Sequence, residues 1–170
     1  KKSAYESTYN PDKLFPINRT TNRATLGIQS GNLPFYGYDI WNHYEVSWLN
    51  DKGKPVAAIA VIIIGCDSEN LIESKSMKLY FNSLNNSQFK DVPSVEAMIK
   101  KDLSERLMST SIILKIIPMD AVQNETLWSA MDGISLDDLD IECSQYNNDP
   151  SYLITENQEI AETVTTNLLK

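Results

Sequence analysis

The chain has 170 residues, and its 15 basic and 23 acidic side chains give a formal net charge of −8. With 42% hydrophobic and 22% charged residues, it has the composition of a globular domain, which excludes disordered and fibrous classes. The acidic balance argues against a nucleic-acid or membrane-surface binder, because both need a basic face. The longest apolar run, Val56 to Ile64, is too short to span a bilayer, so no membrane partner is predicted.

The cysteine content bounds the compartment and the metal chemistry. Two cysteines, Cys66 and Cys143, are too few for the disulfide framework of a small secreted domain. Neither lies in a Cys-x-x-Cys pair, and His43 alone cannot complete a zinc site, so no metal is predicted. The chain opens with Lys1 and shows no charged-then-apolar leader, so we expect a piece of a longer, cytoplasmic protein.

Residues 1–38 are predicted to form an extended N-terminal arm. They are rich in Asn, Thr, Pro and Gly, and turn chemistry recurs at Asn10-Pro11 and in residues 31–34. We expect the arm to pack on the body of the protein through its larger apolar side chains, which are Tyr5, Tyr9, Leu14, Phe15 and Leu26. The predicted module proper covers residues 39–170.

A β-hairpin is predicted next. Residues 44–50 and 56–66 are rich in β-forming side chains, and a polar connection that contains Gly53 separates them. The second strand is apolar at successive positions, so both of its faces need cover. We expect helices on one face and a further domain or subunit on the other.

Two helices are predicted after the hairpin. The first covers residues 71–84, with Asn70 as its N-cap and Glu73 at the capping-box position. The second follows Pro93-Ser94, and its apolar positions recur at helical spacing. These positions are Val95, Met98, Ile99, Leu103 and Leu107, and the opposite, predicted solvated face carries Glu96, Lys100, Lys101 and Asp102.

The last third of the chain returns to strand patterns. Residues 111–119 predict a strand, and residues 139–146 alternate as a half-buried strand does. Residues 125–133 give no clear pattern, and residues 151–170 hold β-formers followed by a segment that fits either a helix or a strand. The order of hairpin, two helices and hairpin predicts an α+β fold with an antiparallel sheet.

Most candidate reactive groups have a simpler structural interpretation. His43 lies among aromatic residues at a strand edge, where a packing role is the simpler one. Cys66 precedes the predicted helix start, where a helix dipole can acidify a thiol, although cysteines often serve as small buried apolar groups. Cys143 is predicted to be a core residue. The acidic residues within 137–142 lack the spacing of a calcium loop and are predicted to face solvent.

Residues 73–80 are chemically unusual. Lys75 and Lys78 stand near a predicted helix start, where the helix dipole disfavours cations. An anion bound at the same helix end would explain them, since helix N-termini favour phosphate. On physical grounds alone, capping by Glu73 and solvation of the lysines are the simpler interpretations.

The sequence of residues 73–80, Glu-Ser-Lys-Ser-Met-Lys-Leu-Tyr, resembles the signature of NADPH-dependent 7-cyano-7-deazaguanine reductases, the nitrile reductases of queuosine biosynthesis. The resemblance extends in the same order through residues 32–35, 39–41, 44–50, 82–83 and 137–141. The chain is similar to the N-terminal module of the long, two-module form of this family.

The resemblance implies a fold and an activity. The fold is the tunnelling fold (T-fold), an antiparallel β-sheet with two helices packed on one face, here as the N-terminal half of a tandem protein whose second module is absent. The activity is oxidoreduction: two NADPH reduce the nitrile of 7-cyano-7-deazaguanine to 7-aminomethyl-7-deazaguanine through a cysteine thioimide, for the modification of tRNA. The implied partners are the chain's own C-terminal module, the substrate and a second copy in a homo-oligomer such as a dimer, with no direct contact to nucleic acid.

The resemblance also implies roles for single residues. Ile72, Glu73 and Ser74 would bind the substrate, and Ser74 and Lys75 would bind NADPH. The nucleophilic cysteine and the proton-transfer aspartate would belong to the second module, beyond Lys170, so the fragment alone is predicted to be inactive. Two alternatives stay open: a non-catalytic T-fold module that binds a purine or pterin or only builds an oligomer, and a cyclohydrolase-like relative, which the lack of a Cys/His zinc set disfavours.

Overall fold

The computed structural model describes residues 8–29, 31–122, 134–135, 151 and 164–165. The chain divides into two compact units, Lys1–Glu125 and Thr126–Lys170. The second unit contains two short strands, β6 (Ile134–Ser135) and β7 (Val164–Thr165), which pair in parallel. The predictions for Tyr5, the acidic residues within 137–142, Cys143, the strand at 139–146 and nearly all of residues 125–133 and 151–170 lie outside the described residues.

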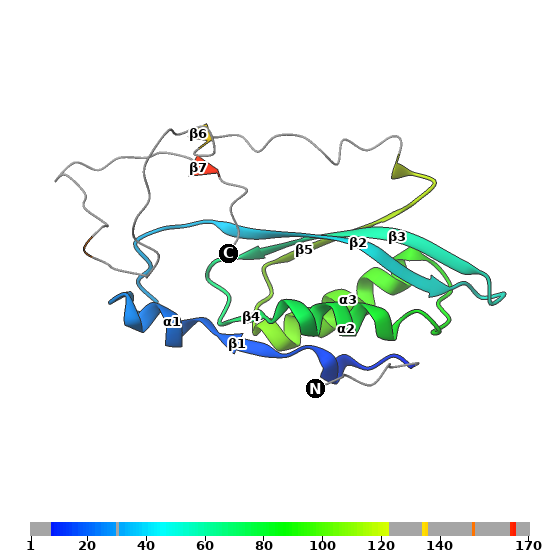
Figure 1. Ribbon diagram of the computed structural model, residues 1–170, viewed down its shortest axis with the longest axis horizontal. Helices are drawn as coiled ribbons and strands as arrows, with labels where there is room; N and C mark the ends of the chain where they lie inside the picture. The colour runs from blue at the N-terminus through cyan, green and yellow to red at the C-terminus, as the bar shows by residue number, and fades with distance from the viewer. Residues whose placement is uncertain (1–7, 30, 123–133, 136–150, 152–163, 166–170) are drawn as a thin grey trace. The chain divides into compact units, whose positions relative to one another are not determined.

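A three-stranded antiparallel sheet forms the centre of the first unit (Figure 1). Its strands are β2 (Tyr38–Leu49), β3 (Pro55–Gly65) and β5 (Ile112–Pro118), in the order β2-β3-β5. The side chain of Asn50 accepts hydrogen bonds from the backbone N–H groups of Lys52 and Lys54, and Gly53 adopts a φ of +77°. These features close the turn between β2 and β3, so the predicted hairpin is confirmed.

Two helices, α2 (Ser74–Ser83) and α3 (Val92–Leu107), cover one face of this sheet (Figure 1). Asp91 caps α3 by accepting a hydrogen bond from the N–H of Ser94, and Pro93 stands in its first turn. The second predicted helix is thereby confirmed. Its predicted solvated face is wrong at Asp102, which is only 5% exposed because two tyrosines cover its carboxylate.

The predicted start of the first helix is wrong. Residues Asn70–Ile72 form strand β4, which pairs antiparallel with β1 (Pro16–Asn18) of the arm. The helix begins three residues later than predicted, at Ser74. The reason is a tertiary contact: the arm provides backbone hydrogen-bond partners for β4. No local pattern can predict a partner so distant in the sequence.

The N-terminal arm contains short regular elements that the sequence did not predict. These are the 3₁₀-helix η1 (Pro11–Lys13), β1 and the helix α1 (Arg19–Thr25), which Asn18 caps. Leu14 is 1% exposed and Tyr9 packs against the core, as predicted. The predicted packing of Phe15 is wrong, because its side chain is 62% exposed.

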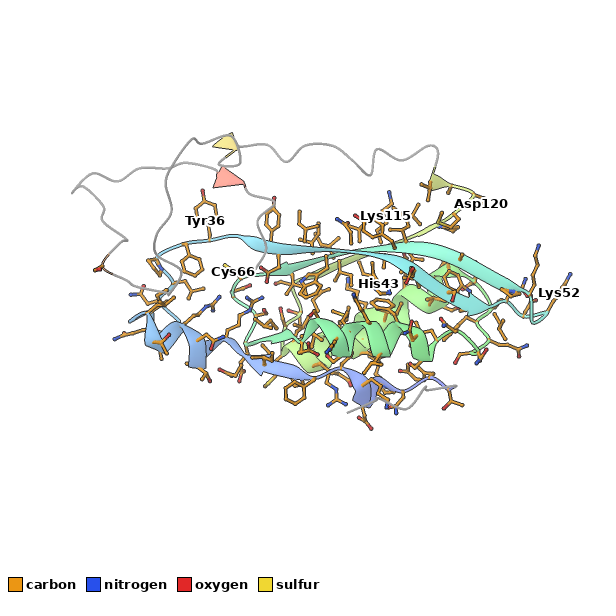
Figure 2. The ribbon with its side chains drawn as sticks, in the orientation of Figure 1. Tyr36, His43, Lys52, Cys66, Lys115 and Asp120 are labelled. Carbon is orange, nitrogen blue, oxygen red and sulfur yellow. The ribbon has the colours of Figure 1, made fainter. Side chains whose placement is uncertain are left out.

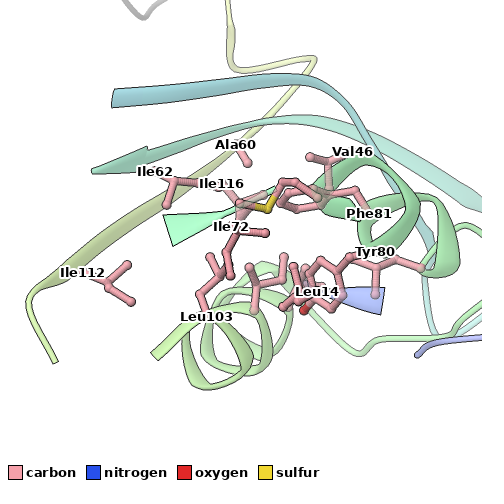
Figure 3. Packing of buried hydrophobic residues seen from close by; sticks show 14 of the residues in the cluster. Leu14, Val46, Ala60, Ile62, Ile72, Tyr80, Phe81, Leu103, Ile112 and Ile116 are labelled. Atoms are coloured by element: carbon pink, nitrogen blue, oxygen red, sulfur yellow. The ribbon is translucent and has the colours of Figure 1, made fainter. Parts of the chain in front are cut away.

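The hydrophobic core lies between the sheet and the two helices (Figure 3). On β3, the side chains at alternate positions are at most 1% exposed, and these are Ala58, Ala60, Ile62 and Ile64. On α3, the buried stripe consists of Val95, Ile99, Leu103 and Leu107, each 0% exposed. The helices of the first unit therefore cover one face of β3. Cover of its other face by a further domain or subunit stays a prediction.

Candidate functional site

The candidate site lies where the β1–β4 ribbon passes into α2. The register sets Pro16 opposite Ile72, and the N–H of Glu73 donates to the carbonyl of Phe15 at 3.0 Å. Pairing with the arm therefore continues by one residue beyond β4. Glu73 itself keeps an extended backbone, with φ −64° and ψ 131°, and the helix begins at the next residue.

The sequence predicted Glu73 as a capping-box residue inside the helix. It is instead the N-cap of α2. Its Oε1 accepts a hydrogen bond from the N–H of Lys75 at 2.9 Å, and its Oε2 accepts one from the N–H of Ser76 at 2.7 Å. These N–H groups hold the pKa of the Glu73 carboxyl below its ordinary value, so the group is ionised at neutral pH. A carboxylate has about four acceptor positions, which leaves acceptor capacity for a ligand.

Ser76 connects this cap to the arm. Its Oγ donates to the carbonyl of Glu73 at 2.6 Å and accepts from the N–H of Phe15 at 3.0 Å. The hydroxyl thus bridges the two backbones at the point where the ladder ends, and the residue is only 6% exposed. No local pattern predicts this role of Ser76, because it depends on Phe15, an arm residue far away in the sequence.

The other predicted substrate and cofactor residues differ in what they can offer. The side chain of Ile72 is 1% exposed and belongs to the core, so only its backbone is available to a ligand. Ser74 and Lys75 are exposed in the first turn of α2. Because Glu73 already occupies the N–H groups of Lys75 and Ser76, an anion at this helix end would meet chiefly side chains.

His43 packs as predicted, between the sheet and the helices (Figure 2). Its ring stacks on that of Phe81, with the centroids 4.3 Å apart and the planes 17° apart. Its Nε2 is buried and has no hydrogen-bond partner among the described residues. Burial lowers the pKa of His43; the charge of Lys78 lowers it further, and Glu45 raises it.

Cys66 does not stand at a helix N-terminus, because β4 follows it instead of a helix. The thiol is free and the residue half-buried, and its carbonyl accepts a hydrogen bond from Arg23 at 2.6 Å. Within the described ranges, no three His, Cys, Asp or Glu side chains gather as a metal site. None of the helices described there is long and apolar enough to cross a membrane.

At the candidate site, Glu73 is half-buried, and Ser74 and Lys75 are exposed. A cavity of about 750 Å³ is lined by other residues: Thr20, Arg23, Gly31, Leu33, Asp67, Ser68, Glu69 and Met108. Neither Glu73 nor its neighbours Ser74 and Lys75 line it. A small ligand that is anchored at Glu73 would therefore lie outside this cavity.

Comparison with known proteins decides the family. A family model described as nitrile reductase, 7-cyano-7-deazaguanine-reductase N-term, matches residues 5–115. The chain belongs to this family. The predicted family and the predicted α+β fold of the T-fold type are thereby confirmed.

Similar proteins of this nitrile reductase family are longer than the chain. It is 49% identical to an NADPH-dependent 7-cyano-7-deazaguanine reductase of Legionella pneumophila (strain Corby), over 98% of the chain and 58% of that protein. Proteins with the same name from Dechloromonas aromatica (strain RCB) and Delftia acidovorans (strain DSM 14801 / SPH-1) are 45% and 42% identical over 100% of the chain, which covers 60% and 62% of them. The chain thus spans about 60% of the length of these curated relatives.

Proposed function

We propose that the chain is the N-terminal module of an NADPH-dependent nitrile reductase that converts 7-cyano-7-deazaguanine into 7-aminomethyl-7-deazaguanine, for queuosine in tRNA. Its relatives carry the name of such a reductase. The observation that carries the proposal to this chain is Glu73, an ionised carboxylate fixed at a helix end with acceptor capacity to spare. In this proposal, residues 1–38 are the arm and residues 39–170 form the first T-fold module.

Glu73 would anchor the heterocycle. The pyrimidine edge of a deazaguanine presents a ring N–H and an exocyclic amino group, and a carboxylate accepts both kinds of donor. Two backbone N–H groups already orient Glu73, so little side-chain freedom is lost when the ligand binds. The backbone of Ile72 and the hydroxyl of Ser74 would line the same site.

Ser74 and Lys75 would meet NADPH. Both side chains are exposed in the first turn of α2, and the ammonium of Lys75 suits a phosphate group. The reduction consumes two hydrides and two protons per nitrile, so two molecules of NADPH must deliver hydride in succession. A covalent thioimide with a cysteine would keep the substrate in place between the two transfers.

We further propose that the nucleophilic cysteine and the proton-transfer aspartate come from the part of the reductase that this chain does not span. Cys66 lies after β3 with its carbonyl bound to Arg23, and no cysteine occurs within residues 69–80. The second module would supply a further wall of the site, and pairing of copies in a dimer would complete the assembly.

A second candidate function is a non-catalytic module that binds a purine or pterin. The observation that favours it is the same anchor without a nucleophile beside it in the sequence. The two candidate functions predict different results, because loss of the Glu73 carboxylate in a non-catalytic module would leave nitrile reduction unchanged.

The proposal predicts distinct effects of two substitutions in the longer polypeptide. Glu73→Gln removes the charge and turns one acceptor into a donor, so affinity for 7-cyano-7-deazaguanine should fall by about 10- to 100-fold. Glu73→Asp retains a good capping residue but withdraws the carboxylate, so the Tm should hold while affinity falls similarly. Isothermal titration, NADPH oxidation and thermal unfolding measure these quantities.

Glu105→Gln is the matched control, because Glu105 is an exposed carboxylate on α3. It should bind and reduce the nitrile as the wild type does. Wild-type affinity in both Glu73 variants would contradict the anchoring role. Wild-type nitrile reduction in them would favour the non-catalytic module.

A further inference from the structure

Apolar side chains share the outer side of the β1–β4 ribbon with Glu73. Alternation along β4 places Leu71 and Glu73 on the side opposite the buried Ile72. The register then sets Ile17 opposite Leu71 and, two residues nearer the N-terminus, Phe15 opposite Glu73. Leu71 and Ile17 are half-buried, whereas Phe15 is 62% exposed.

The backbone of Phe15, which carries this exposed ring, is held by hydrogen bonds. The N–H of Phe15 donates to Ser76 Oγ, and its carbonyl accepts from the N–H of Glu73, both at 3.0 Å. The preceding residue, Leu14, is 1% exposed and fixes the arm in the core. Directly opposed residues of an antiparallel pair have Cβ atoms roughly 5 Å apart. The Phe15 ring and the Glu73 carboxylate are therefore attached to neighbouring positions of the paired backbones.

We propose that Phe15, flanked by Ile17 and Leu71, is the apolar surface on which the planar heterocycle rests when Glu73 holds its N–H edge. This inference rests on the proposed function. A heterocycle anchored by its edge still has two faces in water, and stacking on an aromatic ring removes one of them. The same contact excludes water beside the carboxylate, which strengthens its hydrogen bonds to the ligand.

The charge of Glu73 favours a heterocycle over an apolar protein segment as the occupant of this surface. A segment that covered Phe15, Ile17 and Leu71 would also desolvate an ionised carboxylate without pairing it, which is costly. A ligand with an apolar face and an N–H edge satisfies both parts of the surface. Deazaguanines have this combination.

The test uses 7-cyano-7-deazaguanine and the longer polypeptide in which these residues form the N-terminal module. Phe15→Ala should raise the Kd measured by isothermal titration about tenfold, and Phe15→Leu should raise it less. Phe15→Tyr keeps the ring and should stay within about twofold of the wild type. Tyr36→Ala removes an aromatic ring that is 91% exposed elsewhere, and it should leave the Kd unchanged.

The outcomes separate this inference from the proposed function. Weakened binding by Glu73→Gln with wild-type binding by Phe15→Ala would overturn the stacking role alone. Wild-type binding by Glu73→Gln would overturn the anchoring role that the proposed function gives to Glu73, whatever Phe15 does. An altered sedimentation profile of Phe15→Ala with an unchanged Kd would assign the surface to a protein contact and overturn the inference. If Phe15→Ala lowers the Tm, the comparison of Phe15→Leu with Phe15→Tyr decides, and equal Kd values for these two would overturn it.

Discussion

At the scale of single residues, Glu73 departs from the usual choice at a helix start. Ser, Thr, Asp and Asn are preferred as N-caps because their short side chains reach the first N–H groups. Glu73 reaches the N–H groups of Lys75 and Ser76 with a longer side chain that has to fold back. A residue that breaks a local preference while satisfying its geometry is typical of a functional site.

His43 gives a prediction about acid stability. The burial that lowers its pKa from the ordinary value of 6.5 means that the unfolded chain takes up a proton before the folded one does. The free energy of unfolding should therefore be constant above about pH 6.5. It should decrease as the pH falls from about 6.5 towards the lowered pKa of His43. Urea unfolding of residues 1–170 between about pH 5 and pH 8 measures this dependence.

His43→Phe is the diagnostic variant, because a phenyl ring can keep the stack on Phe81. Its free energy of unfolding should vary less with pH over the same interval, because the titrating group is gone. The charges of Glu45 and Lys78 also influence the pKa of His43. An unchanged pH dependence in the variant would assign the acid sensitivity to other groups.

The signature at 73–80 pointed to the residues of the candidate site, but it did not predict how their backbones and side chains are held. The role of Glu73 as a cap was anticipated, and its position relative to the helix was not. The contribution of Ser76 depends on the N–H of Phe15, 61 residues earlier in the chain. Local patterns contain no information about such a contact.

At the scale of elements, a buried carboxylate joins the arm to both helices. Asp102 of α3 accepts hydrogen bonds on Oδ2 from the hydroxyl of Tyr9, at 2.7 Å, and from that of Tyr80 of α2, at 2.6 Å. Burial and the neighbouring Asp102 raise the pKa of Tyr9 and of Tyr80, so both phenols stay protonated and act as donors. The N–H of Asn10 adds a bond to Ser83 Oγ at 3.1 Å.

Removal of the arm's phenol should therefore loosen the arm. Tyr9→Phe deletes one hydrogen bond to a buried carboxylate and should lower the free energy of unfolding by about 1–2 kcal/mol. Limited proteolysis within residues 8–18 should accelerate. Tyr38→Phe is the control, since it removes the phenol of a tyrosine that is 64% exposed on β2 and should change neither quantity. Equal stability and equal cleavage of Tyr9→Phe would show that Leu14 and the β1–β4 pairing hold the arm without this bond.

The elements that the sequence predicted well are those with local signals. The hairpin has its glycine turn, and α3 has an Asp cap, a Pro and a regular apolar stripe. Strands β1 and β4 are three residues each and exist through their mutual pairing, so neither has a periodic pattern of its own. The burial of Asp102 likewise depends on Tyr9 and Tyr80 and not on the helix around it.

At the scale of the whole molecule, the proposed function gives the first unit one half of a binding site. Its helices cover one sheet face. The proposed anchor, Glu73, does not line the 750 Å³ cavity beside Arg23. The chain spans about 60% of its relatives' length. These facts agree with a division of labour in which one module binds and another reacts.

This division predicts that residues 1–170 alone do not oxidise NADPH in the presence of 7-cyano-7-deazaguanine. The longer polypeptide should consume two NADPH per nitrile, because the conversion of a nitrile into a primary amine requires two hydrides. Cys66→Ala in the longer polypeptide should leave kcat unchanged, since Cys66 is half-buried and its backbone is engaged by Gly37 and Arg23. Absorbance at the NADPH band, with product formation followed in parallel, measures both. Turnover by residues 1–170, abolished by Cys66→Ala, would move the nucleophile into this chain and contradict the division between modules.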